Sequence, residues 1–207
     1  MDPWRNDRDG AMLHTVRHYQ PERVILFFTQ SIWEGRFAKA GHQAYDWQKI
    51  IQTIAPKSQV ELIQKEIAEE HDFDGYKEIF HQQLSQLRQA HPSAEILLNV
   101  TSGTPQMETT LCLEYITNPQ KLTCIQVAKP IASSNARRKF ATPEEQEIDL
   151  EIVNQEEQAH ASRCKEVAII SFKQTMIRKQ LESLIDNYDY EVAIRLLESH
   201  KDTYQSQ

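Results

Sequence analysis

Residues 96–107 read ILLNVTSGTPQM, a short apolar run followed by a turn of hydroxyl residues and then a proline. The run at 96–100 has the nearly continuous apolar character of a parallel strand that is covered on both faces. Pro105 suits the first position of a helix, because the N–H that it lacks would find no partner there, and Thr104 suits the N-cap. The stretch therefore predicts a strand, a tight turn and a helix, the repeating unit of an open α/β sheet.

The same alternation extends outward from this unit. Apolar or β-leaning runs, which we expect to be strands, lie at residues 24–29, 59–64 and 122–127. Apolar residues at helical spacing predict three helices, at residues 12–19, 47–54 and 76–87. Strands that alternate with helices through short loops imply right-handed crossovers and parallel pairing. We therefore expect an α/β fold with a Rossmann-like, doubly wound, mostly parallel sheet between helices.

The character of the chain changes after Pro130. We expect residues 131–147 to form an exposed loop, with a basic cluster at 137–139, and residues 148–153 to form a strand. From residue 172 to about residue 199 the pattern is helical, with a break near residues 186–188.

Two regions follow from this change, an α/β domain over residues 1–165 and a short helical region over residues 166–207. A doubly wound domain normally begins with a strand that becomes central in the sheet, whereas this chain leads almost directly into a helix. We expect either an unusual sheet or a missing first strand.

Composition narrows the class of protein. The chain has 207 residues, of which 40% are apolar and 26% charged, which is ordinary for a folded domain. No apolar run approaches the ~18 residues of a membrane span, and residues 1–10 do not resemble a secretory signal, so we expect a cytoplasmic protein without membrane contact. The net charge of −7 argues against binding long nucleic acids by bulk electrostatics.

Cysteine and glycine counts exclude several kinds of site. The three cysteines lie far apart with no C-x-x-C pair, which argues against structural zinc and against a disulfide framework. The five glycines include neither a dinucleotide fingerprint nor a P-loop. We therefore expect no cofactor and no metal.

The turn after the 96–100 strand is the best candidate for a ligand site. Hydroxyls of Thr101, Ser102 and Thr104 and the amides of a helix N-terminus converge there, at the carboxyl end of a strand, where open α/β sheets bind ligands. Gly103 lets the backbone turn or approach a ligand closely. The turn contains no lysine, so it suits singly charged phosphodiesters better than triphosphates. The structural alternative is a well-capped strand–helix junction without a ligand.

A second candidate lies at the start of the first predicted helix. Asn6, Asp9 and Gly10 could border a ligand there, and Arg5 or Arg8 could meet a phosphate. The alternative is a helix cap surrounded by solvated charges.

Other residues favour structural roles. His14 and His18 share a helical face but lack the glutamate of a zinc-protease motif, so we expect ordinary surface or core histidines. Trp33 could stack on a base or pack under its loop. Arg195 and His200 resemble the R-x4–6-H motif of HEPN ribonucleases, but the match is short and we interpret it as chance.

Two segments together resemble a known family. RDGAMLHTVRHYQPERV at residues 8–24 is similar to the opening of CARF-domain proteins of type III-A CRISPR systems, and NVTSGTPQM at residues 99–107 is similar to their ligand loop. Residues 163–164 and 187–190 resemble the stretch that joins the CARF domain to a helical region. The resemblance covers nearly the whole chain.

The resemblance implies a CARF domain that dimerises and binds a cyclic oligoadenylate, made by the CRISPR effector when it senses foreign RNA. In the family, this binding activates a C-terminal HEPN domain that cuts RNA without metal. By resemblance, the ring would be contacted by Thr101, Ser102, Gly103, Thr104 and Gln106, with Asn6, Asp9 and Gly10 at its border. The first strand and the HEPN domain are not recognised in this chain, so we expect a fragment for which RNA is a substrate only of the missing domain.

Three functions remain open at this point. The leading hypothesis is a non-catalytic cyclic oligoadenylate sensor that seats its ligand on residues 101–106 across a homodimer. The enzymatic alternative is a slow, metal-independent ring nuclease, in which a ligand 2′-hydroxyl attacks the adjacent phosphate. The third is a CARF-like transcription regulator, which the weakly basic C-terminal helices do not favour, so we expect no stable DNA binding.

Overall fold

Two pairs of parallel strands form the centre of the computed structural model, which describes residues 4–5, 8–35, 45–67, 72–117, 122–130 and 161–201. β3 (Arg23–Thr29) pairs with β4 (Gln59–Lys65), and β5 (Ile96–Asn99) pairs with β6 (Leu122–Val127). All four strands occur where the sequence predicts them. The loop and strand expected at residues 131–147 and 148–153 lie outside the described residues.

Three further strands were not expected. β1 (Trp4–Arg5) and β2 (Arg8–Asp9) form a short antiparallel pair before the first helix, where we predicted no strand. β7 (Cys164–Val167) pairs antiparallel with β6 and spans the predicted domain limit at residue 165. These strands are two to four residues long and mostly polar, and such segments carry no alternating apolar pattern to reveal them.

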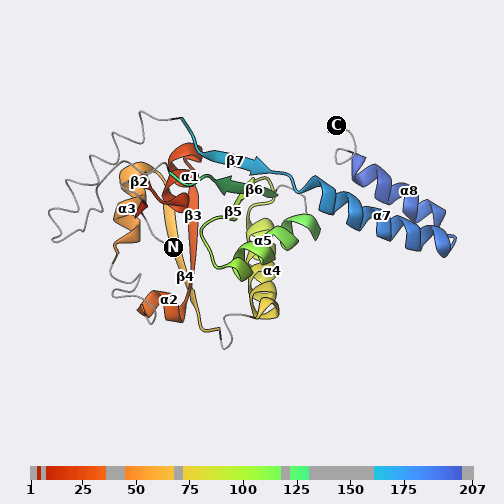
Figure 1. Ribbon diagram of the computed structural model, residues 1–207, viewed down its shortest axis with the longest axis horizontal. Coiled ribbons are helices and arrows are strands. Elements are labelled where there is room, and N and C mark those ends of the chain that lie inside the picture. Colours follow the sequence, from red (N-terminus) through yellow and green to blue (C-terminus); the bar gives the residue numbers. More distant parts are fainter. Residues whose placement is uncertain are drawn as a thin grey trace.

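Helices cover both faces of the strands. Val24, Leu26 and Phe28 of β3 pack with α1 (Ala11–Tyr19) and α3 (Trp47–Ile54). Phe27 points to the opposite face, where it meets α4 (Phe73–Ala90) and α5 (Pro105–Thr117). The predicted α/β fold of Rossmann-like type is confirmed, with α1 and α3 on one face of the strands and α4 and α5 on the other (Figure 1).

The described strands fall into separate ladders, β3–β4 and β5–β6–β7, and within the described residues no ladder joins β3 to β5. The helices connect the two. α4 contributes Tyr76 and Phe80 to the cluster around Phe27 and contributes Leu84 to the cluster around Leu98 of β5. α1 packs on α3 and also contacts β5, β6 and β7.

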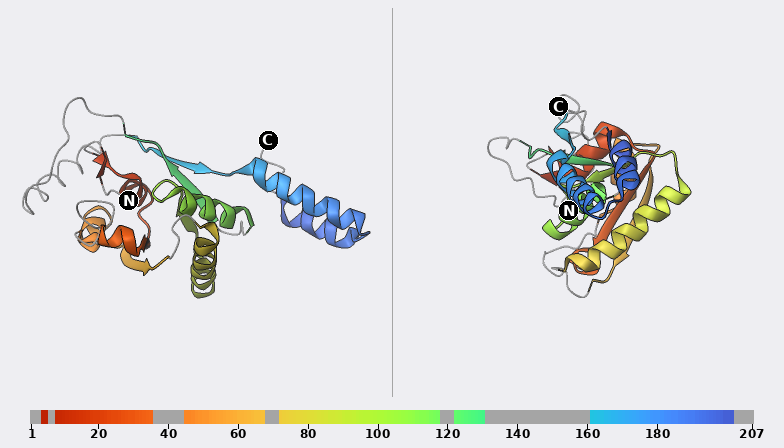
Figure 2. Two further views of the ribbon diagram at one scale, coloured as in Figure 1. Left: turned by 60° about the horizontal axis from the view of Figure 1, so that its bottom comes forward. Right: turned by 90° about the vertical axis from the view of Figure 1, so that its right-hand side faces the viewer.

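A helical hairpin extends away from this body. α7 (Ile170–Asp186) follows β7 directly, and α8 (Tyr190–Ser199) folds back along it after a turn at residues 187–189 (Figure 2). The two helices and the break between them match the sequence prediction. The short helix α2 (Gln30–Glu34) completes the described elements. Among all of these, none is both long and apolar enough to cross a membrane.

Candidate ligand-binding site

The hydroxyl-rich turn begins at Asn99, the last residue of β5. Its side chain receives a hydrogen bond from the backbone N–H of Thr101 (2.9 Å) and donates to the carbonyl of Ala11 (3.2 Å) and to Thr15 Oγ1 (2.9 Å). Ala11 is the first residue of α1, directly after Gly10. Asn99 therefore joins the two segments that the sequence nominates as halves of a site.

The next two residues attach the turn to β6. The N–H of Val100 donates to the carbonyl of Ile125 (3.0 Å), and Thr101 Oγ1 accepts from the N–H of Val127 (2.9 Å). Val100 is buried among the apolar residues below the turn. Two hydrogen bonds thus attach the first part of the loop to β6, and the Thr101 Oγ1 lone pair that faces Val127 is already used.

The helix that follows is capped as predicted. Thr104 Oγ1 accepts from the N–H of Met107 (3.3 Å), and the Thr104 carbonyl accepts from the N–H of Glu108 (3.0 Å). Within the described residues the side chains of Ser102 and Gln106 have no hydrogen-bond partner, and both are partly exposed. A hydroxyl and an amide therefore remain available at the positive end of α5.

Gly103 lies close against the first turn of α5. A Cβ at this position would lie 3.0 Å from Met107 Cβ and 3.4 Å from Met107 Sδ. Met107 is itself buried against α4, so it has little room to move. The glycine allows the turn to lie directly on the first turn of α5.

Glu108 is a feature of the loop that the sequence analysis missed. Its carboxylate Oε1 accepts a hydrogen bond from the N–H of Gly103 (3.2 Å). Burial raises the pKa of Glu108 above its ordinary value, and the Gly103 hydrogen bond partly opposes that rise. The Glu108 carboxylate therefore already accepts a hydrogen bond from one of the loop N–H groups that a phosphate would bind.

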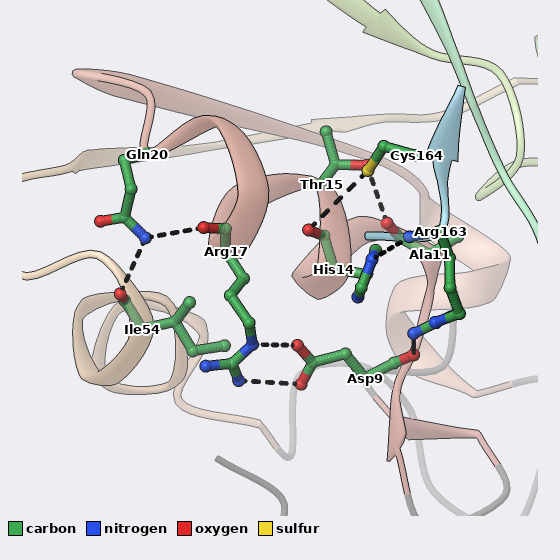
Figure 3. Close-up of polar contacts among 9 residues, drawn as sticks. All are labelled: Asp9, Ala11, His14, Thr15, Arg17, Gln20, Ile54, Arg163 and Cys164. Atoms are coloured by element: carbon green, nitrogen blue, oxygen red, sulfur yellow. Dashed lines mark hydrogen bonds and ion pairs between the residues drawn. The ribbon is translucent and has the colours of Figure 1, made fainter. Parts of the chain in front are cut away.

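The start of α1 differs in chemistry from the loop. Gly10 is the N-cap of α1 and is buried. The Asp9 carboxylate is fully buried and forms a two-point ion pair with Arg17, at 2.6 and 3.2 Å (Figure 3). The Asp9 side chain therefore binds α1, while the backbone carbonyl of Asp9 accepts a hydrogen bond from Arg163. Asn6, the third residue predicted here, lies outside the described residues.

Arg163 is a second residue that the sequence analysis did not assign to the site. Its guanidinium donates to the carbonyl of Asp9 (2.7 Å), and its backbone N–H donates to Nε2 of His14 (2.8 Å) (Figure 3). The guanidinium also donates to the carbonyl of Ala128 (2.8 Å). The residue thereby links β7, the end of β6 and the start of α1. Nothing in local sequence spacing reveals such a link, because its partners lie 35 to 154 positions away.

Within the described residues, the remaining candidates contact other parts of the protein. His14 is buried and accepts the Arg163 N–H, and Trp33 packs on Phe28 at 5.3 Å. Arg195 donates to the carbonyl of Glu191, and His200 contacts the carbonyl of Leu196. The basic cluster at residues 137–139 lies outside the described residues.

Two family models match this chain, and both describe domains of Csm6 proteins. Residues 59–164 match the family model described as the Cas_Csm6 CARF domain, and residues 167–207 match the model described as the Csm6 6H domain. The first match runs from the start of β4 to the first residue of β7, with the candidate loop inside it.

Similar proteins carry one name. The chain is 59% identical over 200 residues to the CRISPR system endoribonuclease Csm6 of Enterococcus italicus, covering 97% of this chain and 46% of that protein. It is 31% identical over 199 residues to the protein of that name from Mycobacterium tuberculosis, covering 94% of this chain and 46% of that protein. The chain thus spans about half the length of the curated relatives that it matches.

A solved structure is similar over nearly the same span. Enterococcus italicus Csm6 bound to cyclic hexa-2′-fluoro-hexa-dAMP superposes with a TM-score of 0.86 and 57% identity, covering 97% of this chain and 47% of that one. That structure holds a cyclic oligoadenylate analogue of six units.

Proposed function

The chain belongs to the Csm6 CARF domain family, and on this premise we propose that it senses a cyclic oligoadenylate for a type III CRISPR ribonuclease. The ligand would sit on residues 101–106, with the start of α1 at its border. The observation that carries the proposal is the pair of unpartnered side chains, Ser102 and Gln106, at the positive end of α5 in the described structure.

The chemistry of the loop fits a phosphodiester ring. Each linkage of such a ring carries one negative charge, and a helix N-terminus with a hydroxyl and an amide donor matches a singly charged phosphate. The overall charge of −7 would repel an extended nucleic acid, so the attraction has to be local. The relative solved with a six-unit ring supports six units for this chain as well.

The assembly that we propose is a homodimer in the cytoplasm. A ring with two-fold symmetry can be contacted by two copies of the same loop, which is the arrangement of an isologous dimer. The three free cysteines of the described structure suit a reducing compartment. The relatives that carry the name endoribonuclease are about twice as long as this chain. We therefore propose RNA cleavage for a whole protein of that length and ligand sensing for this chain.

Calorimetry with cyclic hexa-adenylate tests the proposal. We expect saturable binding by the unmodified chain and a loss of at least about tenfold in affinity for the double variant Ser102→Ala, Gln106→Ala. Thr117→Ala is a matched control, because Thr117 lies at the far end of α5, where its hydroxyl donates to carbonyls of the same helix. Linear hexa-adenylate should bind more weakly than the ring.

Absence of heat with a folded chain would contradict the proposal, and so would equal affinity of the double variant and the unmodified chain. Circular dichroism of each variant establishes that the fold is retained in both cases.

A further inference from the structure

Two cysteines that are 12 positions apart in sequence face each other in the core. Cys112 lies on α5 and is partly buried, whereas Cys124 lies on β6 and is fully buried. Both belong to the apolar cluster that α5 forms over β5 and β6, together with Leu98 and Tyr115. Cys112 packs against the cluster that contains Cys124, and the interaction of the two thiols shifts the pKa of each.

A buried lysine completes the cluster. Lys173 of α7 lies with Nζ 3.5 Å from the centre of the Tyr115 ring and is only 9% exposed. Its ammonium group lies close enough to Cys124 to favour the ionised form of that thiol. The pair therefore has the ammonium group of Lys173 beside Cys124 and the carboxylate of Glu108 near Cys112, where that carboxylate disfavours the thiolate. A nearby cation is typical of the surroundings that favour reactive thiols.

The third cysteine cannot take part. Cys164 pairs with Val127 in the β6–β7 ladder, and Val127 is three residues from Cys124 on the same strand, so the two side chains point to opposite faces. Cys164 Sγ instead contacts the carbonyl of His14 on α1 (4.0 Å). The pair Cys112 and Cys124 is thus isolated from the other thiol of the described structure.

We propose that Cys112 and Cys124 are an oxidation-sensitive dithiol, which a low-molecular-weight disulfide converts to an intrachain disulfide that joins α5 to β6. This site is independent of ligand binding on residues 101–106. The sequence analysis expected no disulfide framework because it considered only spacing along the chain, and this pairing arises from the packing of a helix on a strand.

The two cysteines have different parts in the reaction. Cys112 is partly exposed whereas Cys124 is buried, so the sulfur of Cys112 is the first that an oxidant reaches. Interaction with the Cys124 thiol stabilises the Cys112 thiolate and lowers the pKa of Cys112 to about 7. The same contact, together with burial, raises the pKa of Cys124 and keeps that thiol protonated.

The exchange proceeds in two balanced steps. The Cys112 thiolate attacks one sulfur of oxidised glutathione, so that a mixed disulfide forms, the glutathione S–S bond breaks and one glutathione thiolate leaves. Cys112 then no longer carries a negative charge that opposes the ionisation of Cys124. The ammonium group of Lys173 favours the ionisation of Cys124. The Cys124 thiolate attacks the Cys112 sulfur and releases the second glutathione. In sum, two protein thiols give up two electrons and two protons, and one oxidised glutathione becomes two reduced molecules.

Mass spectrometry of the folded chain after incubation with oxidised glutathione tests this proposal. Trypsin cuts after Lys121, between the two cysteines, so a disulfide leaves two peptides joined. We expect joined peptides in the unmodified chain and equally in Cys164→Ser. In Cys124→Ala the reaction should stop with glutathione on Cys112, and in Cys112→Ser the thiol of Cys124 should stay free.

Three results would overturn the proposal. These are glutathione that persists on Cys112 while Cys124 is intact, preferential modification of Cys164, and retention of all three thiols by the folded chain. The unmodified chain and Cys164→Ser suffice to decide, so the outcome does not depend on whether the core variants fold.

Discussion

Asn99 and Thr15 are 84 residues apart, yet Asn99 Nδ2 donates a 2.9 Å hydrogen bond to Thr15 Oγ1 and thereby attaches the end of β5 to the second turn of α1. The same amide group holds the carbonyl of Ala11, and its oxygen holds the N–H of Thr101. One side chain thus sets the position of the candidate loop relative to the helix beside it.

Removal of this link should loosen the loop. Asn99→Ala deletes three hydrogen bonds of partly buried groups, so we expect a loss of about 2 kcal/mol in the free energy of unfolding and a fall of about tenfold in affinity for cyclic hexa-adenylate. Urea unfolding and calorimetry measure the two effects. Thr15→Ser keeps the hydroxyl and should retain both properties, and an Asn99→Ala chain with unchanged affinity would refute the positioning role.

The charge of Glu108 should oppose ligand binding. Glu108→Gln keeps an oxygen acceptor for the Gly103 N–H but removes the negative charge beside the loop, so we expect affinity for the anionic ring to rise about threefold to tenfold. A weaker or equal affinity would show that the carboxylate does not face the ligand. The adjacent substitution Thr109→Ala, on the exposed side of α5, is the control.

Acidity should change affinity through the same residue. Burial raises the pKa of Glu108, and protonation neutralises the group, so affinity should increase as the pH falls toward that raised pKa and should decline as the pH rises past it. Titration of binding between pH 8 and about pH 5 measures the effect. The dependence should be lost in Glu108→Gln, and its persistence there would assign it to another group.

The ion pair between Asp9 and Arg17 should matter more to stability than an exposed pair. Asp9→Ala leaves Arg17 without the carboxylate of a fully buried partner, so we expect a loss of about 3–5 kcal/mol in the free energy of unfolding. Arg23→Ala, which breaks the exposed pair with Glu61, should cost less than about 1 kcal/mol. Similar losses in the two variants would contradict this interpretation.

Alkylation should distinguish Cys112 from the other thiols. Because its pKa is lowered to about 7, the thiolate predominates above that pH, and its rate of reaction with iodoacetamide should rise with a midpoint near pH 7. Cys124 and Cys164, whose pKa values are raised, should react slowly under the same conditions. Peptide mapping after short exposure measures each rate, and a midpoint near that of an ordinary thiol would remove the reactive role of Cys112.

The local structure of the candidate loop was visible as a sequence pattern. Pro105 and Thr104 mark the start of α5, and the turn before it has the donors that a phosphate needs. Glu108 could have been suspected, since an acidic residue in the first turn of a helix often meets a free amide, but its contact with Gly103 depends on how the turn folds back. Arg163 could not be found, because its partners belong to segments that approach only after the strands have paired.

Periodicity alone determined the four parallel strands, the helices between them and the helical hairpin, because burial of an apolar face leaves a repeat of two or of 3.6 residues in the chain. The tertiary structure alone decided that the Asp9 side chain forms an ion pair with Arg17, that Asn99 is hydrogen-bonded to α1 and that Cys112 packs in the same cluster as Cys124. Such contacts join residues on different elements, and their distances are set by packing between layers, which leaves no regular spacing along the sequence.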